Sequence, residues 1–275
     1  AMSSGGRGIF STPFENHLFN VVHIDVPIQG LEEESLNQLS DTIQNNKVCG
    51  FVFEPLLQGA AGMVMYEPEI LSKLIKLCQQ NDVVTIADEV STGFGRTGRF
   101  FASDYLVSKP DIICMSKGLT GGVMALGATS ATDKIYNAFL SEDKSKMFLH
   151  GHSYTGNPLA CTAALASLEL MNKPSTWDNI LLIQNCHLDF IAKNRDNINI
   201  VNARNLGVIL AITVKSSSEE TYFNYLRDKL YNHFIDNHIL LRPLGNVIYV
   251  MPPYCFTMEN LELVYDSILG LLEEL

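Results

Sequence analysis

Residues 83–98 read VVTIADEVSTGFGRTG, an apolar run that ends in two carboxylates and then becomes rich in glycine. The run 83–90 predicts a strand that lies buried in a sheet. A charge at the end of a buried strand is costly unless a partner compensates it. The position of Asp88 therefore indicates a site at which a cation is held.

The segments on either side of this stretch alternate between strand and helix, which is typical of an α/β fold with a mainly parallel sheet flanked by helices. We expect strands at 48–55, 83–90 and 111–117, and helices at 68–82 and 157–171. The helix at 68–82 can begin at its proline and carries one apolar stripe. That stripe consists of Ile70, Leu71, Leu74, Leu77 and Cys78.

Beyond about residue 172 the strict alternation stops. We expect a helix near 178–194, a strand at 208–214, a helix near 219–237, the apolar segments ILLRPL and NVIYVMPP, and a last helix at 258–274. This mixture predicts a smaller α+β domain. Because KPST (173–176) breaks the helical pattern, we divide the chain into a large domain, 1–174, and a small C-terminal domain, 175–275.

The bulk composition excludes several classes of protein. The formal charge of −11 disfavours a nucleic-acid surface, which needs clustered Lys and Arg. No apolar run approaches the roughly 18 residues of a membrane span, and the N-terminal residues do not resemble a signal peptide. Six cysteines without a CxxC pair indicate buried, reduced thiols in a cytosolic protein. They are Cys49, Cys78, Cys114, Cys161, Cys186 and Cys255.

The glycine-rich loop allows three interpretations. Gly93, Gly95 and Gly98 satisfy GxGxxG, the dinucleotide-binding pattern, but that pattern needs a helix that begins at the glycines. No helical stripe follows, and the carboxylates before the loop would repel a pyrophosphate. Alternatively, the glycines serve only left-handed turns, with Arg96 solvated or paired with Glu89.

The third interpretation uses the residues around the loop. Residues two apart on a strand share a face, so Asp88 and Val90 point the same way. The next strand ends at Lys117, which begins the glycine-rich sequence KGLTGG. Ligands of α/β sheets bind at the carboxyl ends of parallel strands. A carboxylate for the pyridine nitrogen, an aliphatic side chain for the ring and a lysine for the aldehyde are what pyridoxal phosphate (PLP) requires.

Three ordered motifs carry a family resemblance: IADEVSTGFGRTG (86–98), PDIICMSKGLTGG (110–122) and HGHSYTGNPLACTAALASLEL (150–170). Together they resemble the class III, fold-type I PLP-dependent aminotransferases. LTGG after the lysine and RPLGNVIYVMPPY (242–254) resemble the biotin-pathway branch, adenosylmethionine-8-amino-7-oxononanoate aminotransferases. The resemblance implies the fold-type I large domain followed by a small α+β domain, and a cytoplasmic homodimer.

The resemblance also implies roles for individual residues. Lys117 would form the Schiff base with PLP, Asp88 would bind the pyridine nitrogen, and Val90 would pack on the ring. Ser153 stands where the family usually has a threonine that binds the cofactor phosphate from the neighbouring subunit. Arg242 would bind the substrate carboxylate, as its planar guanidinium is suited to do. Tyr249 and Gly151 would complete the substrate site.

The implied reaction transfers the amino group of S-adenosylmethionine to 8-amino-7-oxononanoate. The resemblance begins after the family's N-terminal glycine–serine phosphate loop and ring-stacking tyrosine, so we expect about the first third of a typical member to be absent from this sequence. Three alternatives remain open: an ω-amino-acid or ornithine aminotransferase, a nicotinamide-dependent oxidoreductase, and an inactive fragment.

Three further features each allow a functional and a purely structural interpretation. His150 and His152 suggest a metal site, but without acidic or thiol ligands nearby we interpret them as loop histidines at a subunit interface. Arg242 lies between apolar neighbours, so we expect it to be at least partly buried. Glu54, at the end of the first strand, either faces the active site or caps a turn.

Overall fold

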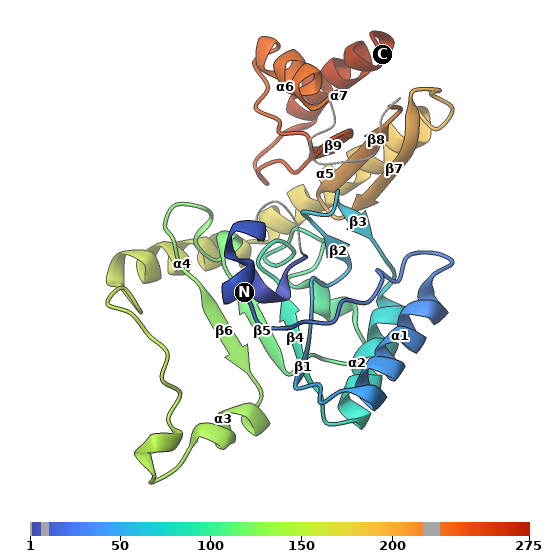
Figure 1. The fold of residues 1–275 in the computed structure, drawn as a ribbon. Helices are drawn as coiled ribbons and strands as arrows, with labels where there is room; N and C mark the ends of the chain where they lie inside the picture. Colours follow the sequence, from blue (N-terminus) through green and yellow to red (C-terminus); the bar gives the residue numbers. More distant parts are fainter. Residues whose placement is uncertain (1, 7–10, 217–225) are drawn as a thin grey trace.

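A computed structural model describes residues 2–6, 11–216 and 226–275. Its first sheet has the order β1-β4-β5-β6, with β1 (Gly50–Phe53), β4 (Val84–Asp88) and β5 (Ile112–Met115) parallel and β6 (Ala128–Ala131) antiparallel. The strands lie side by side in Figure 1. The expected strands at 48–55, 83–90 and 111–117 are all present, each shorter at its ends.

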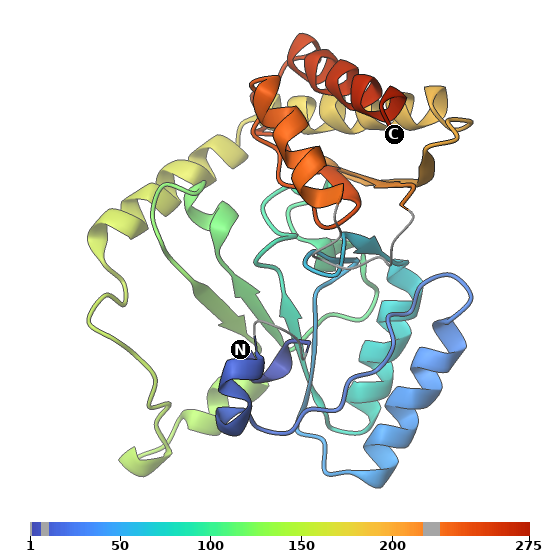
Figure 2. The ribbon, with the colours of Figure 1, turned by 45° about the horizontal axis from the view of Figure 1, so that its top comes forward.

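Helix α2 (Pro68–Gln80) packs on this sheet, and α1 (Glu32–Asn45) lies beside α2 in Figures 1 and 2. The predicted stripe of α2 is confirmed, since Ile70, Leu71, Leu74 and Cys78 are buried and Leu77 is partly buried. Burial raises the pKa of the Cys78 thiol to about 12. Through this apolar stripe, α2 packs between the sheet and α1.

A two-stranded hairpin, β2 (Leu57–Gln58) with β3 (Val64–Met65), connects β1 to α2. The guanidinium of Arg204 fixes its turn, because Nε donates to the Met63 carbonyl at 2.7 Å and Nη2 donates to the Gly62 carbonyl. The hairpin was not expected from the sequence. It packs in one apolar cluster with Ile209, Ala211 and Val247 of the C-terminal sheet.

The helical break predicted at KPST is present, since α4 (Pro158–Met171) ends before α5 (Pro174–Lys193) begins. The antiparallel sheet that follows has the order β7 (Ile200–Leu206), β8 (Ile209–Val214), β9 (Val247–Val250). Strand β7 was missed from the sequence, and ILLRPL makes only an isolated bridge at Leu244. The division of the chain at 174/175 stays a prediction.

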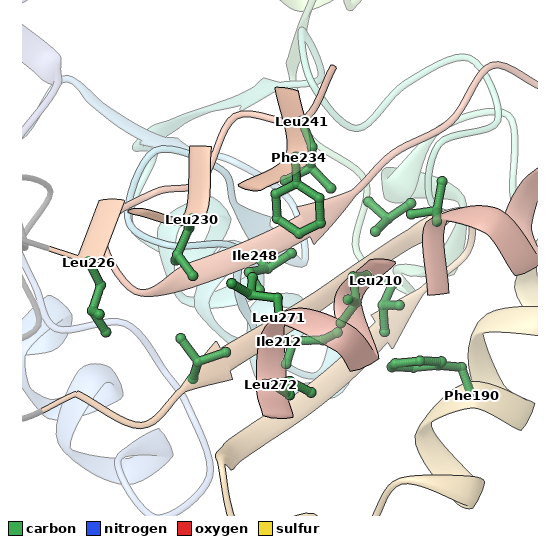
Figure 3. Close-up of a cluster of buried hydrophobic side chains, with 14 residues drawn as sticks. Phe190, Leu210, Ile212, Leu226, Leu230, Phe234, Leu241, Ile248, Leu271 and Leu272 are labelled. Carbon is green, nitrogen blue, oxygen red and sulfur yellow. The ribbon is translucent and has the colours of Figure 1, made fainter. Parts of the chain in front are cut away.

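Helices α5, α6 (Leu226–Asp236) and α7 (Met258–Glu273) pack on one face of the C-terminal sheet, and Figure 3 shows the buried cluster between the helices and the sheet. The first part of the helix expected near 219–237 lies outside the described residues.

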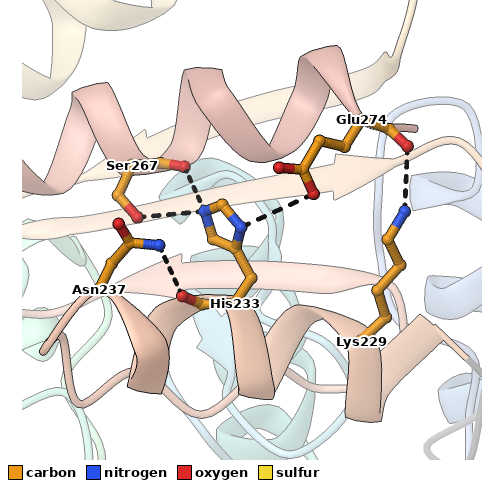
Figure 4. A network of polar contacts seen from close by, with 5 residues as sticks. All are labelled: Lys229, His233, Asn237, Ser267 and Glu274. Carbon is orange, nitrogen blue, oxygen red and sulfur yellow. Dashed lines mark hydrogen bonds and ion pairs between the residues drawn. The ribbon is translucent and has the colours of Figure 1, made fainter.

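Two polar contacts also join α6 to α7 and its C-terminal end. His233 Nε2 lies 2.9 Å from the Ser267 carbonyl, and Lys229 donates to the Glu274 carbonyl (Figure 4).

Helix α5 carries a buried histidine, His187, that contacts α7. His187 Nε2 must donate to the Val208 carbonyl at 3.2 Å, so Nδ1 accepts from the Tyr265 hydroxyl at 2.6 Å. Burial lowers the pKa of His187 to about 4. The imidazole is therefore neutral at pH 7 and serves as a packed hydrogen-bonding group.

The remaining loops and helices include α3 (Asp133–Phe139) and five short 3-10 helices: η1 (Met2–Ser4), η2 (Thr12–His17), η3 (Ala102–Tyr105), η4 (Lys117–Thr120) and η5 (Lys144–Lys146). Among the described residues, no helix is long and apolar enough to cross a membrane. All six cysteines are free. The expectation that they are buried is wrong for Cys49, Cys161 and Cys255, because Cys49 precedes β1, Cys255 lies in a turn and Cys161 lies on an exposed face of α4.

Candidate functional site

Three charged residues follow the carboxyl ends of the three parallel strands. Glu54 follows β1, Asp88 ends β4, and Lys117 lies two residues beyond β5. The register aligns Phe53 with Ala87 and Asp88 with Cys114. The strands therefore deliver one cationic and two anionic side chains to the same edge of the sheet, where ligands of such sheets bind.

Lys117 is held in an unusual backbone conformation at the start of η4. Its φ is +42°, in the left-handed region that non-glycine residues seldom adopt. The Gly122 amide donates to its carbonyl at 3.2 Å, and its Nζ donates to Ser91 Oγ at 2.7 Å. Strained backbone of this kind persists where surrounding contacts determine it, often at functional sites.

Asp88 lies on the half-buried face of β4. Thr85, Ala87 and Glu89 are fully buried on the other face. The strand ends at Asp88, two residues earlier than predicted, and Val90 belongs to the following turn. Among the described residues, the one hydrogen bond to the Asp88 carboxylate comes from the Val90 amide, at 3.0 Å.

Glu54 also lies at this edge, and it has features of both roles that its sequence position allows, because it accepts from a turn amide and lies near Asp88 and Lys117. Its Oε2 accepts from the Gly59 amide at 3.1 Å. Burial raises the pKa of the Glu54 carboxyl, the negative charge of Asp88 adds to this, and the Gly59 hydrogen bond and Lys117 oppose it. A Cβ at Gly59 would lie 3.5 Å from Oε2 and 4.0 Å from Ser91 Oγ, so both side chains approach this glycine.

Glu89 is completely buried and fully hydrogen-bonded. Its Oε1 accepts from the amide and the hydroxyl of Ser103, each at 2.7 Å, and its Oε2 accepts from Thr92 Oγ1 at 2.6 Å and from the Ala102 amide at 3.1 Å. The suggested pairing of Arg96 with Glu89 is therefore wrong. These bonds fix the turn that follows β4.

The glycine-rich loop packs against C-terminal residues. Arg96 donates to the Pro252 carbonyl at 2.8 Å and lies 4.8 Å from the centre of the Tyr254 ring. The Tyr254 hydroxyl donates to the Phe94 carbonyl at 2.6 Å, and burial raises its pKa to about 12. A Cβ at Gly95 would lie 2.8 Å from Ile180 Cδ1.

The dinucleotide-binding interpretation of this loop is therefore wrong. A pyrophosphate site needs a long helix whose N-terminal amides point at the ligand. The loop leads instead into the four-residue helix η3. Because its glycines lack side chains, residues of the C-terminal part pack closely on the loop. The loop thereby connects the strand ends to that part of the chain.

The other expected site residues lie apart from the strand ends. Ser153 and Gly151 are exposed in the segment between α3 and α4, and no hydrogen bond within the described chain joins them to Asp88 or Lys117. Tyr249 is half-buried on β9 in the cluster shared with the β2–β3 hairpin. Arg242 is exposed, contrary to the expectation of partial burial, because in this extended segment its neighbours Leu241 and Pro243 point inward.

The loop histidines make local contacts. The His150 ring stacks on Phe148 at 5.5 Å, and His152 Nδ1 accepts from the Tyr154 amide at 3.2 Å. In the described parts of the chain, no group of three or more His, Cys, Asp or Glu is placed to hold a metal ion.

Two members of the site were not identified from sequence. In the sequence, Ser91 is simply one residue of the glycine-rich loop, and Glu54 fits either an active-site or a turn-capping role. Ser91 follows Asp88 by three residues in a turn, and its link to Lys117 spans 26 positions of the chain. No periodic pattern encodes such a contact.

Comparison with known proteins gives a consistent result. The aminotransferase class-III family model matches residues 1–272. The adenosylmethionine-8-amino-7-oxononanoate aminotransferase of Synechococcus elongatus is 38% identical over 100% of this chain and 66% of its own length. The protein of the same name from Methanocaldococcus jannaschii is 35% identical, again over 100% of this chain and 66% of its own length.

Solved structures show the same fold. The crystal structure of the Methanocaldococcus jannaschii protein superposes with a TM-score of 0.87, at 35% identity, over 97% of this chain and 63% of that one. An omega transaminase from Pseudomonas jessenii in complex with PMP superposes with a TM-score of 0.86, at 21% identity, over 95% and 62%. The predicted fold class, a mainly parallel large-domain sheet with a smaller α+β part, is confirmed.

The chain spans about two thirds of the length of the curated relatives that it matches. The match nevertheless includes all three sheets and all the strand ends described above. The identity with the first relatives exceeds 30% over the whole chain, and the family model covers all but its last three residues. This chain therefore belongs to the class-III aminotransferase family.

Proposed function

We propose that this chain acts as part of a PLP-dependent aminotransferase of biotin biosynthesis. The enzyme would transfer the amino group of S-adenosylmethionine to 8-amino-7-oxononanoate and release 7,8-diaminononanoate. The observation that carries the proposal is the convergence of Asp88 and Lys117 at the ends of β4 and β5. The printed names of the relatives at 34–38% identity support the choice of substrates.

The residues at the sheet edge fit PLP. The Asp88 carboxylate is half-buried and can pair with a protonated pyridine nitrogen, which explains a charge at the end of a buried strand. Val90, half-buried in the turn after Asp88, would offer an aliphatic surface to the ring. Lys117 presents an amine just beyond the end of the neighbouring strand β5. Its positive charge is close enough to Glu54 to lower the pKa of that carboxyl.

When bound, PLP supplies an electron sink that makes the hydrogen on the donor's α-carbon acidic. Asp88 would keep the pyridine nitrogen protonated by its negative charge. Lys117 would bind the cofactor covalently before the donor arrives. Its Nζ would accept the proton from the donor's α-carbon and return it later as a general acid.

We assign the substrate and phosphate contacts to residues outside the strand ends. Arg242 would bind the carboxylate of the acceptor, with Tyr249 and Gly151 beside it, because a guanidinium binds a carboxylate through two parallel hydrogen bonds. Ser153 would donate its hydroxyl to the cofactor phosphate of a second subunit. Its exposure supports a contact outside its own chain.

The enzyme is proposed to be a cytoplasmic homodimer. The segment from 123 to 170 exposes many large apolar side chains, and a concentration of exposed apolar residues favours an interface. They are Val123, Met124, Tyr136, Phe139, Leu140, Met147, Phe148, Leu149, Tyr154, Leu159, Leu165 and Leu170. The segment also contains Ser153, as its proposed role across a subunit boundary requires. Six free cysteines support a reducing compartment.

The test is to incubate the chain with PLP, reduce with borohydride and map the peptides by mass spectrometry. We expect a pyridoxyl group on Lys117, and none at this position in Lys117→Ala. Failure to trap Lys117, both in this chain and in a version extended to the full length of the relatives, would contradict the proposal. A panel of amino donors on the extended enzyme then separates S-adenosylmethionine from ω-amino acids and ornithine.

A further inference from the structure

Two non-glycine residues in left-handed conformations meet beside the site. Phe94 has φ +58° and Lys117 has φ +42°. They are in contact through Gly118, where a Cβ would lie 2.9 Å from Phe94 Cβ and 3.0 Å from Phe94 Cδ2. The aromatic ring and the lysine backbone therefore fit together only because residue 118 has no side chain.

The same loop also reaches the other end of the lysine. Ser91, three residues before Phe94, accepts a hydrogen bond from Lys117 Nζ at 2.7 Å. A lysine side chain is a flexible four-carbon chain that ends in a strongly hydrated ammonium group. Contact at the backbone alone therefore leaves the ammonium free to move. Contact at both ends fixes where the amine lies.

Other bonds hold this loop in place. Its Gly93 amide donates to the Glu89 carbonyl at 3.0 Å, and the Thr92 hydroxyl donates to the Glu89 carboxylate. The Phe94 carbonyl accepts from Tyr254, a residue 160 positions away. The loop therefore has contacts independent of Lys117 and can act as a rigid support.

We propose that Ser91 is a positioning residue for Lys117 and that residues 91–94 hold this lysine at both its backbone and its amine. The proposal rests on the function proposed above, in which Lys117 is the reacting lysine. It adds a role for the glycine-rich loop that differs from phosphate binding.

A hydroxyl suits this role because it can both accept and donate. It accepts from the ammonium form of Lys117 and, after rotation, can donate to the lone pair of the neutral amine. The charge-assisted bond is the stronger of the two, so Ser91 favours the ammonium. The charged groups that face the amine from β1 and β4 are Glu54 and Asp88, and both remain when Ser91 is replaced.

The test is trace acetylation of the full chain with acetic anhydride across neutral and alkaline pH, with the reactivity of Lys117 read by peptide mass spectrometry. In Ser91→Ala we expect the pH midpoint of this reactivity to fall by about half a unit, which raises the reactivity at neutral pH about threefold. Ser91→Thr keeps the hydroxyl and should retain the original midpoint. Thermal unfolding checks each variant, and Ser91→Cys replaces Ser91→Ala if that variant does not fold.

The matched control is Ser116→Ala. Ser116 is adjacent to Lys117, but its hydroxyl donates to the Leu126 carbonyl at 2.7 Å and does not contact Nζ. We expect no change in the midpoint. An unchanged midpoint in Ser91→Ala, or an equal shift in Ser116→Ala, would overturn the positioning role.

Trapping with PLP and borohydride on the unaltered chain keeps the two proposals separate. A trapped Lys117 without a Ser91 effect would overturn the positioning role alone. A Ser91 effect without any trapping, in this chain and in the extended one, would overturn the proposed function and leave a lysine held for another purpose.

Discussion

Strands β8 and β6 differ completely in how far their residues are buried. Every residue of β8 is buried, because it is the central strand of its sheet, with helices on one face and the β2–β3 hairpin on the other. Every residue of β6 is exposed, because it is the edge strand of its sheet and the segment after it lies open. The rest of the chain therefore covers β8 on both faces, whereas it leaves β6 open.

The largest expected effect comes from placing the same charge on each strand. Ala211→Asp on β8 would bury an unpaired carboxylate among Leu57, Met63 and Val247, at a cost of about 3 kcal/mol or more. Ala131→Asp on β6 should change the free energy of unfolding by less than about 0.5 kcal/mol. Urea unfolding at low protein concentration measures both. Equal losses would show that β6 is covered in solution.

The buried histidine beside β8 predicts a loss of stability in acid. The unfolded chain binds a proton at His187 near pH 6.5, whereas the folded chain does so only near pH 4. Between these values the unfolded state holds more protons, so stability is fully present above pH 6.5 and falls by about 3 kcal/mol as the pH drops toward 4.

Urea unfolding at several pH values, with His187→Gln for comparison, tests this expectation. The glutamine variant should be less stable at pH 7, and its stability should depend less on pH over this window. Parallel curves for the two proteins would refute the role of His187.

Adding a methyl group to Gly207, in the turn between β7 and β8, should also destabilise the fold. Gly207 has φ +57°, and a Cβ there would lie 2.2 Å from the Thr97 carbonyl carbon. Gly207→Ala should lower the free energy of unfolding by about 2 kcal/mol. Gly270→Ala is the control, because it lies within α7 with no neighbour inside 4 Å and should be neutral or gain up to about 1 kcal/mol. A neutral Gly207→Ala would show that the loop and this turn are not tightly packed.

The smallest effect is expected beside β6. Lys134 of α3 forms an ion pair with Asp82, and both side chains are largely exposed. Such pairs are screened by solvent and contribute little. Lys134→Ala should leave the thermal unfolding midpoint unchanged, at low and at high salt. A clear salt-dependent decrease would show that this region is more strongly held than its exposure suggests.

The comparison also separates what the sequence could predict from what it could not. The apolar runs located β1, β4, β5 and β8, and their carboxyl ends placed Asp88 and Lys117 together, because strand direction alone determines that edge. The stripe of α2 was equally readable. These features depend on local sequence periods, about two residues in a strand and about 3.6 in a helix.

The errors concern contacts that no local pattern encodes. β6 reads ATSA, which is too short and polar to indicate a strand, and its pairing with β5 depends on the rest of the sheet. The outward direction of Arg242 follows from alternation in a segment that makes only an isolated bridge. The hydrogen bond of Ser91 and the approach of Glu54 depend on the tertiary arrangement of loops far apart in sequence.

The packing of the glycine-rich loop against Pro252, Tyr254 and Ile180 has a consequence for dividing the molecule. A fragment that ends near residue 174 would lose the acceptor for Arg96 and the donor to the Phe94 carbonyl, and would expose the face of Gly95. The loop that contacts Lys117 would then lack its support. The two parts of the chain are thus poor modules for recombination with those of other proteins, and any exchange must carry residues 91–98 together with the segments they contact.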